Sequence, residues 1–385
     1  MPYRRLLFAL LAVVSWTSAA LAITPPPYDP IRFAFPGSIP SPGDAASAAL
    51  AGADRWLSSV AGGNPASMPH STGVTLSPIL QRISRQDLSA ENREFSQTTF
   101  FLDGASGQLA WRAGEWGLRL EASQPMLRRE TSTFSVAIGG AVTQPARVQV
   151  DAQARESRAA LALSRASGAW RFGAAAELSQ RSDRYTTIEV SGSPESGERE
   201  LAFEGSALGG SAGATWSRNA ESRWGIEVGA AARFVGAIDA TFESVSELLS
   251  GTSVSTGEAD RDATWEAGAS ARITVDPRGG HAWACLETRS AERWPGLSLA
   301  SDRAAAWRIG YDYRDSATPW VVRVGAGQEV QPGTPEPRAT AIGVGLGWRA
   351  DDLRFDLGVT HRSIRRGEAP IQTDTRLVGS VGIDF

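Results

Sequence analysis

Apolar and polar residues alternate one by one along most of the chain, and this period of two constrains the fold more than any other feature. Leu353, Phe355 and Leu357 are separated by Arg354 and Asp356, and segments 224–230, 307–313 and 342–348 follow the same pattern. Successive side chains of a β-strand point to opposite faces, so each segment predicts a strand with one apolar face. A soluble sandwich and a transmembrane barrel would both produce this pattern.

The connections between the expected strands alternate in length, and this separates the two architectures. Strands are placed at 72–82, 96–112, 116–127, 157–166, 169–182, 204–217, 222–236, 262–275, 281–290, 304–314, 319–328, 338–349, 352–364 and 374–385. Short turns alternate with longer loops at 83–95, 128–156, 183–203, 237–261, 291–303, 329–337 and 365–373. Outer-membrane barrels combine short periplasmic turns, long outer loops and an even strand number. We therefore predict an all-β protein, a transmembrane antiparallel β-barrel of about 14 strands over 71–385 with both ends periplasmic.

Tryptophan positions and the end of the sequence agree with a membrane barrel. Eight of the 13 tryptophans lie near the expected short turns: Trp111, Trp116, Trp170, Trp216, Trp224, Trp283, Trp320 and Trp348. They predict an aromatic girdle at the periplasmic interface, although turns that merely border apolar strands would give the same clustering. The last segment, 381–385, alternates and ends in Phe385, the form of final strand that barrel-assembly machinery recognises. Phe385 is the expected assembly signal, and the expected location is the outer membrane of a Gram-negative-type bacterium.

The first 22 residues have the pattern of a signal peptide. Arg4 and Arg5 precede a nine-residue apolar stretch at 6–14, and the small-residue site Ala20-Leu21-Ala22 follows. The apolar stretch is too short to favour a membrane anchor. Residues 23–70 are expected to form a plug, irregular in the proline-rich part and helical at 44–60, where Asp44 is the expected N-cap.

Charged residues occupy the polar face of many expected strands and should point into the barrel lumen. They are Arg112, Arg119, Glu121, Arg171, Glu177, Glu227, Arg233, Glu266, Arg272, Arg308, Asp312, Arg323, Arg354, Asp356 and Arg376. Charges of both signs favour an ion-pair network that braces the wall over the alternative of a substrate path. No cluster of apolar side chains stands out as a ligand site.

Several function classes find little support in the residues. The formal charge of −4 is spread along the chain, without a basic tract for nucleic acid. The three histidines, His70, His281 and His361, lie far apart on the expected strands, so a Ser–His–acid relay is not expected. No His, Cys and carboxylate grouping has zinc-ligand spacing, and the lone Cys285 cannot form an internal disulfide. We therefore expect a protein without catalytic activity, metal or other cofactor.

Segment 44–66, which includes the expected plug helix, carries a resemblance to a known family. Residues 48–54 and then Gly63-Asn64-Pro65-Ala66 resemble the inward-folded N-terminal segment of the FadL superfamily of outer-membrane proteins. The resemblance implies a fourteen-stranded barrel with a lumenal hatch in which Asn64, Pro65 and Ala66 form the motif. The chain departs from the family at 67–69, where family members continue into a small and then an apolar residue.

The resemblance implies two functions, which remain open. The first is a hatch-gated outer-membrane channel or transporter for small, hydrophobic compounds. The alternative is a secretion or surface-attachment component like PorV, which does not transport solutes. The expected partners are membrane lipids, the barrel-assembly machinery and either a hydrophobic small molecule or secretion components. No nucleic acid is expected.

Overall fold

The computed structural model describes most of the chain. It covers residues 44–58, 62–67, 72–86, 96–137, 145–190, 197–218, 225–248, 251–276, 279–295, 299–301, 303–314, 318–330, 337–350, 352–366 and 369–385. The predicted signal peptide, the proline-rich segment and His70 lie outside these residues. The described part contains no helix with the length and apolar character needed to cross a membrane.

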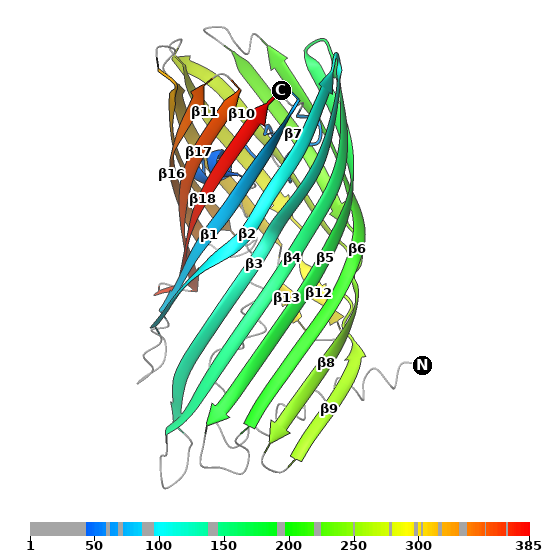
Figure 1. Cartoon of the computed structure of the whole chain (residues 1–385), viewed down its shortest axis with the longest axis vertical. Coiled ribbons are helices and arrows are strands. Elements are labelled where there is room, and N and C mark those ends of the chain that lie inside the picture. Colours follow the sequence, from blue (N-terminus) through cyan, green and yellow to red (C-terminus); the bar gives the residue numbers. More distant parts are fainter. Residues whose placement is uncertain are drawn as a thin grey trace.

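The described residues form a closed antiparallel β-barrel (Figure 1). Its strands are β1 (Gly73–Gln86), β2 (Ser96–Ala113), β3 (Trp116–Ala137), β4 (Pro145–Ser167), β5 (Trp170–Val190), β6 (Gly197–Arg218), β7 (Ile226–Val235), β8 (Asp239–Leu248), β9 (Gly251–Glu258), β10 (Thr264–Asp276), β11 (Gly280–Arg289), β14 (Ala304–Arg314), β15 (Trp320–Val330), β16 (Pro337–Ala350), β17 (Leu353–Arg366) and β18 (Ala369–Asp384). β7 and β8 follow one another along a single strand of the wall, and so do β9 and β10. The sixteen labelled strands therefore make a wall of fourteen, as predicted. Pairing of β1 with β18 closes it.

The outer face of the wall carries a belt of exposed apolar side chains, which runs around the barrel on the short-turn side. Leu120, Leu161 and Leu178 are each close to half exposed on neighbouring strands, and Ile309, Val344 and Leu357 are also about half exposed on the opposite wall. An outward apolar band on a closed barrel is what a hydrocarbon bilayer requires. The alternation in the sequence therefore places apolar residues toward lipid, and the sandwich alternative is wrong.

The predicted tryptophan girdle is correct for several positions and wrong for one. Trp111, Trp116, Trp170 and Trp320 are exposed on the outer face beside short turns. Trp283 instead points inward, where its indole Nε1 donates to the carboxylate of Asp312. A buried indole N–H needs an acceptor, and lipid offers none at this depth. Trp224 lies outside the described residues.

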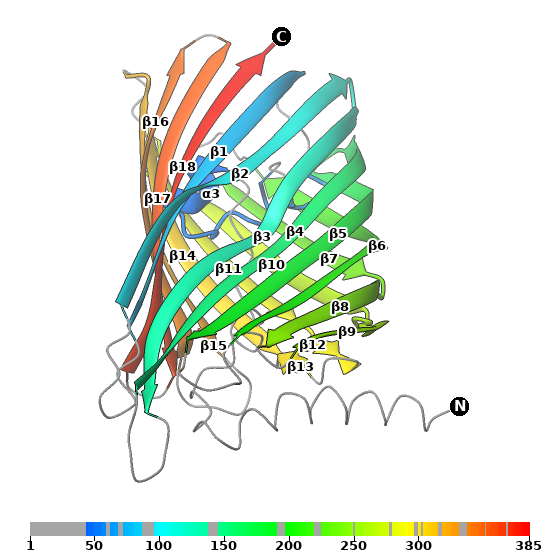
Figure 2. The ribbon, with the colours of Figure 1, turned by 60° about the horizontal axis from the view of Figure 1, so that its bottom comes forward.

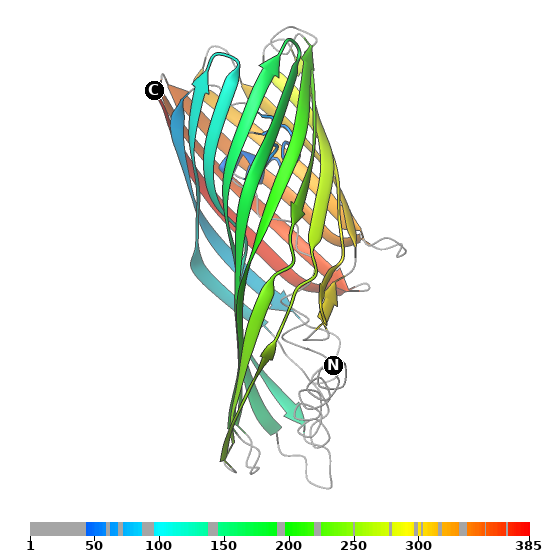
Figure 3. The same ribbon diagram turned by 90° about the vertical axis from the view of Figure 1, so that its right-hand side faces the viewer.

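Strands β3 to β6, together with β8 and β9, extend past the rest of the barrel on the long-loop side (Figures 1 and 3). The loops predicted at 128–156, 183–203 and 237–261 are therefore largely strand. Beyond the apolar belt the outward residues of β5 become polar, as at Gln180, Ser182 and Arg184, while the inward residues include Arg181 and Asp183. With both faces polar, the alternation that predicts a strand is lost. The loop predicted at 291–303 also contains a hairpin, β12 (Glu292–Trp294) and β13 (Leu299–Ser301).

The wall is not paired along its full height between β2 and β3. These strands pair only from Gly107↔Ala122 to Ala113↔Trp116, next to their short turn. Beyond this point β2 pairs with β1 and β3 pairs with β4. The two strands diverge visibly toward the long-loop side (Figure 2). In the described residues the wall therefore parts between β2 and β3.

The N-terminal helix is shorter than predicted. α3 spans Ala45–Ala49, and the side chain of Asp44 accepts a hydrogen bond from the backbone N–H of Ser47, at 2.8 Å, as an N-cap. The predicted extension to residue 60 is wrong. Ala51 and Gly52 have left-handed φ angles of 53° and 82°, and Gly52 N–H donates to Ser47 C=O. This C-terminal turn ends the helix and redirects the chain.

Candidate functional site

The described part of the N-terminal segment, residues 44–58 and 62–67, is called the plug here. It lies inside the barrel, where α3 is surrounded by the strands (Figure 2). Ala45, Ala48, Trp56 and Asn64 are fully buried. The α3 N-terminus is held by Ser380, whose hydroxyl accepts from the backbone N–H of Ala45 at 2.9 Å.

Glycines of the wall allow the plug to lie directly against the strands, and we call them the glycine track. They are Gly173, Gly213, Gly229, Gly268, Gly310, Gly325, Gly343 and Gly358, on eight different strands. A Cβ at any of these positions would come within 3.0 Å of a plug atom. At Gly325 and Gly343 that atom belongs to the plug backbone, which cannot rotate away. The track therefore fits a backbone at close approach, which only glycine permits.

Asn64 connects the plug to the wall at several points. Its side-chain amide N–H groups donate to the carbonyls of Trp56, Ala214 and Ala230, and its Oδ1 accepts from Ala66 N–H at 2.9 Å. The Asn64 carbonyl accepts from Arg119 Nη2 at 3.0 Å. The Asn64-Pro65-Ala66 motif therefore fixes the turn of the plug and attaches it to β6 and β7 by hydrogen bonds. Pro65 lies beside Gly173, and Ala66 is buried.

A buried arginine of the plug bridges two carboxylates of the wall. Arg55 donates to Glu266 of β10 and to Glu287 of β11, each at 2.8 Å. Glu266 also pairs with Arg233, and Glu287 pairs with Arg308 at 2.7 Å. Charge-assisted bonds of this kind are strong when buried. The plug therefore gives each of these two carboxylates a second arginine partner, in addition to Arg233 and Arg308 of the wall.

This cluster is part of a longer chain of ion pairs through the lumen. The chain continues from Arg233 to Glu177 at 3.0 Å, Glu177 to Arg158 at 3.7 Å, Arg158 to Glu156 at 3.1 Å, Glu156 to Arg261 at 3.7 Å and Arg261 to Glu292 of β12 at 3.7 Å. It connects the plug to the outer hairpin. Among the described residues, the lumen beside the plug is therefore polar and filled rather than apolar and open.

The remaining predicted lumen charges form smaller groups toward the short-turn side. The pairs are Arg119 with Glu121 at 3.3 Å, Arg171 with Glu227 at 3.3 Å, Arg272 with Glu227 at 3.0 Å, Arg323 with Asp356 at 2.6 Å and Arg354 with Asp384 at 3.6 Å. Asp312 contacts His281 Nδ1 at 3.3 Å, Arg376 is buried and Arg112 is exposed at the rim. Phe385 is largely exposed, and its N–H donates to the carbonyl of Thr72 at 2.8 Å.

A carboxyl group inside the plug has an altered acidity. Asp54 is buried, and the Ser47 hydroxyl donates to its carboxylate at 2.8 Å. Burial, together with the nearby carboxylate of Asp44, raises the pKa of Asp54 to about 7. The plug therefore carries a group that titrates near neutral pH.

The structure contains an apolar cluster in the outer half of the lumen that the sequence reading did not find. It is formed by Tyr185, Leu201, Phe203, Val235, Ile238 and Trp294 with smaller neighbours. Trp294 of the hairpin is fully buried, with its ring centroid 4.9 Å from that of Phe203. Arg181 and Arg261 lie over the Trp294 ring, each at 6.0 Å. The signal was the alternation at Ile238, Ala240 and Phe242, within a stretch that we assigned to a loop.

The site has no chemistry that points to a metal. Within the residues that the structure describes, no group of three or more His, Cys, Asp or Glu side chains is arranged to hold a metal ion. His281 and His361 lie on β11 and β17, and His361 Nδ1 lies 2.9 Å from the hydroxyl of Thr375. The geometry is that of a barrel with an occupied lumen.

Comparison with known proteins identifies the class of fold. No protein-family model matches the chain, and no curated protein matches its sequence. Among solved structures, a FadL homologue from Pseudomonas aeruginosa aligns with a TM-score of 0.66 and 12% identity, over 91% of this chain and 100% of that one. A mutant of the monoaromatic hydrocarbon channel TodX aligns with a TM-score of 0.61 and 14% identity, over 89% and 99%. The toluene transporter TbuX of Ralstonia pickettii aligns with a TM-score of 0.58 and 13% identity, over 89% and 98%.

These likenesses define a FadL-like transmembrane β-barrel, as the plug motif implied. At 12–14% identity they concern the fold. A closed barrel with an even number of strands, short turns on one side and an outward apolar belt is the architecture of the bacterial outer membrane. The chain is a barrel of this architecture, and two of the structures that it resembles are named as a channel and a transporter.

Proposed function

We propose that this protein is an outer-membrane channel for small, hydrophobic compounds, with the plug as its hatch. The observation that carries the proposal is a lumen filled by a separate segment, next to a wall that parts between β2 and β3. The channels and transporters of similar fold support the substrate class, since two of them are named for monoaromatic hydrocarbons and toluene.

A route through the barrel must avoid the plug or move it. The plug lies against the glycine track on eight strands, and Arg55 and Asn64 bond it to the wall. A compound that has entered from the long-loop side must therefore pass the buried ion pairs before it reaches the plug. Movement of the plug would open the lumen, and the separation of β2 from β3 offers an apolar solute an exit toward lipid.

The apolar cluster around Trp294 is the proposed first contact for the compound. It lies on the long-loop side of the plug and includes aromatic side chains from β5, β6 and the hairpin. An apolar ligand and the Trp294 indole would compete for the same surface, because both bury it from water. The hairpin would then act as a cover that a hydrophobic ligand displaces.

A reversible lock on the plug tests the hatch. An ideal Cβ at Gly345 would lie 2.5 Å from the Cβ of Ala49, so Ala49→Cys with Gly345→Cys places two thiols close enough to bridge after a small shift. The background carries Cys285→Ala. We expect that oxidation stops uptake of the hydrophobic dye 1-N-phenylnaphthylamine by cells that make the variant, and that reduction restores it.

The single variant Ala49→Cys is the matched control, since it responds to oxidant without a bridge. Equal dye uptake by the oxidised and reduced double variant, with the bridge verified by mass, would contradict gating by the plug. Uptake no greater than in cells without the protein would contradict the channel itself.

The alternative of a secretion or surface-attachment component is favoured by one feature. The outer edge of β9 is unpaired and lies beyond the apolar belt. A role in holding another polypeptide would use this edge rather than the lumen. A barrel that never passes the dye yet binds a peptide at β9 would favour this alternative over the channel.

A further inference from the structure

Among the described residues, β9 is paired on one side along its whole length, whereas β2 and β3 are still paired with each other next to their short turn. Residues Gly251–Glu258 pair with β8 from Thr241↔Glu258 to Leu248↔Gly251. The same wall strand continues as β10, which pairs with both β7 and β11. Among the described residues, no strand pairs with the second edge of β9. The edge lies at the end of the extended part of the wall (Figures 1 and 3).

The alternation of antiparallel hydrogen bonds shows which backbone groups face outward from this edge. Ala259 N–H donates to Ala240 C=O at 2.7 Å, so the odd-numbered residues that precede Ala259 bond to β8. The N–H and C=O groups of Thr252, Val254, Thr256 and Glu258 then point toward the free edge. Eight residues at about 3.3 Å each make this edge roughly 26 Å long.

The edge lacks the features that normally prevent strand addition. Exposed edges in natural sheets are protected by lysine, proline, bulges or inward charges. β9 contains none of these within Gly251–Gly257, and its side chains are exposed apart from Gly257. Val254 is 60% exposed at the centre of the strand, well beyond the apolar belt. An unprotected edge of this length can accept an added strand.

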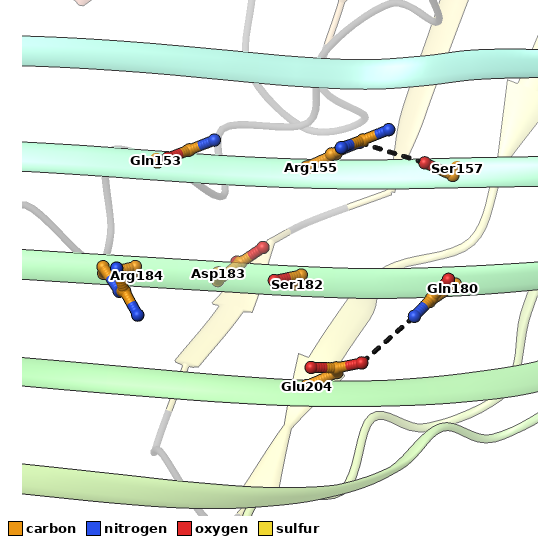
Figure 4. A pocket seen from close by; sticks show the side chains of 8 residues that line it. All are labelled: Gln153, Arg155, Ser157, Gln180, Ser182, Asp183, Arg184 and Glu204. Atoms are coloured by element: carbon orange, nitrogen blue, oxygen red, sulfur yellow. Dashed lines mark hydrogen bonds between the residues drawn. The ribbon is translucent and has the colours of Figure 1, made fainter.

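The outer face beside the edge is acidic. Outward carboxylates on β6, β8 and β9 are Glu198, Glu200, Glu204, Glu243, Glu247 and Glu258. Glu198 and Glu247 are cross-strand neighbours, which places like charges side by side. Arg184 pairs with Glu200 at 3.0 Å. On the same polar face Gln180 donates to Glu204 at 3.1 Å (Figure 4). Complementary charge on an added strand would be basic.

We propose that the outer edge of β9 binds an extended, basic segment of a soluble polypeptide outside the membrane, by addition of a β-strand. Backbone hydrogen bonds to Thr252, Val254 and Thr256 would hold the segment. The acidic face would select arginine or lysine at alternate positions, because alternate side chains of the added strand lie on that face.

A second copy of the chain does not fit the edge. Two copies in one membrane are related by rotation about the membrane normal, so their β9 strands would run in the same direction. Each copy would also present the same free edge of its β9 to the other copy. Two parallel strands in a sheet pair differently, because one strand uses its left edge and the other its right edge. The partner must therefore be free to approach in another orientation, which a soluble segment can do.

The test uses a fluorescent ten-residue peptide in which arginine alternates with threonine or valine. We expect saturable binding to the full-length barrel in detergent, measured by anisotropy, and slower backbone hydrogen exchange at 252–258 when the peptide is present. Val254→Pro removes an N–H from the free edge without removing a bond to β8. It should weaken binding at least tenfold, while Val254→Thr keeps the N–H and should bind as the unchanged chain does.

Three results would overturn the proposal. The first is equal binding of a peptide with the same charge and prolines at alternate positions, since charge alone would then suffice. The second is unchanged exchange at 252–258, a measurement on the unchanged chain that does not depend on the proline variant folding. The third is efficient disulfide cross-linking of two copies through Val254→Cys in membranes, which would make the edge a contact between copies.

Discussion

Replacing Arg55 by methionine should release the plug from the wall while the barrel stays folded. Arg55 is the plug residue that donates to both Glu266 and Glu287, at 2.8 Å each. Methionine keeps much of the side-chain volume but removes the charge. Two wall carboxylates would then share fewer positive partners inside the lumen.

The size of the effect follows from what remains after the change. Removal of one partner from a buried ion pair costs about 3–5 kcal/mol, because an uncompensated charge stays buried. Glu266 keeps Arg233 and Glu287 keeps Arg308, so we take the lower end, about 3 kcal/mol. At 1.4 kcal/mol per factor of ten, the undocked fraction of the plug should rise roughly a hundredfold.

Thiol labelling measures this fraction. Ala53 is fully buried in the docked plug, so Ala53→Cys in a Cys285→Ala background reports each undocking to a soluble maleimide. We expect roughly hundredfold faster labelling with Arg55→Met, reckoned from that population change. Boiled and unboiled samples should migrate differently on detergent gels, which verifies that the barrel is folded.

Two further variants decide whether charge is the cause. Arg171→Met removes a lumen arginine that pairs with Glu227 on the wall, and it should leave labelling unchanged. Adding Glu266→Gln to Arg55→Met removes the stranded charge, while Arg233 keeps Glu177, so labelling should slow again. Equal acceleration by Arg171→Met, or no recovery in the double variant, would refute the electrostatic reasoning.

Three other changes have defined outcomes. Gly325→Ala should displace the plug and speed Ala53→Cys labelling, because its Cβ would meet the Leu50 backbone at an overpacking cost of about 1–3 kcal/mol. The control Gly379→Ala should leave labelling unchanged, because its Cβ would meet only Pro78, at 3.8 Å. Trp294→Ala should cost about 3–5 kcal/mol of stability and lower the melting temperature. Binding of 1-N-phenylnaphthylamine to the variant in detergent should increase, and unchanged dye binding would argue against a covered apolar site. The docked plug holds the Asp54 proton more tightly than the undocked plug, so docking weakens as pH rises from 4 to about 7. The rate of Ala53→Cys labelling, corrected for the reactivity of a free thiol, should therefore increase over that window, and it should not increase when Asp54→Asn is added.

Much of the barrel follows from the local pattern of residues. The alternation at 353–359 and the short turns predict strand number and the lipid-facing side, because a strand in a bilayer wall must present apolar residues outward. The same rule explains the errors at 183–203 and 237–261. There the strands leave the bilayer, both faces become polar or mixed, and no local signal separates an exposed strand from a loop.

The site was predictable only in part. The sequence predicts that the side chains of Arg233, Glu177 and Arg308 point into the lumen. Successive residues of a strand point to opposite faces, so the residues that do not face lipid must face inward. Their partners do not follow, because Arg55 meets Glu266 from more than two hundred positions away in the chain. Trp294 also reaches its apolar cluster through a hairpin whose three-residue strands have too few residues to show a period.

The sequence by itself determined a membrane barrel of about fourteen strands, an Asp44 helix cap and a lumen lined by charges of both signs. These features depend on side-chain period and on neighbours within a few positions. Only the tertiary structure decided that eight glycines form one track for the plug, that Arg55 completes an ion-pair cluster, and that β9 is left with a free edge. Each of these depends on distances across a closed wall, and such distances are set by strand register and barrel closure rather than by local sequence.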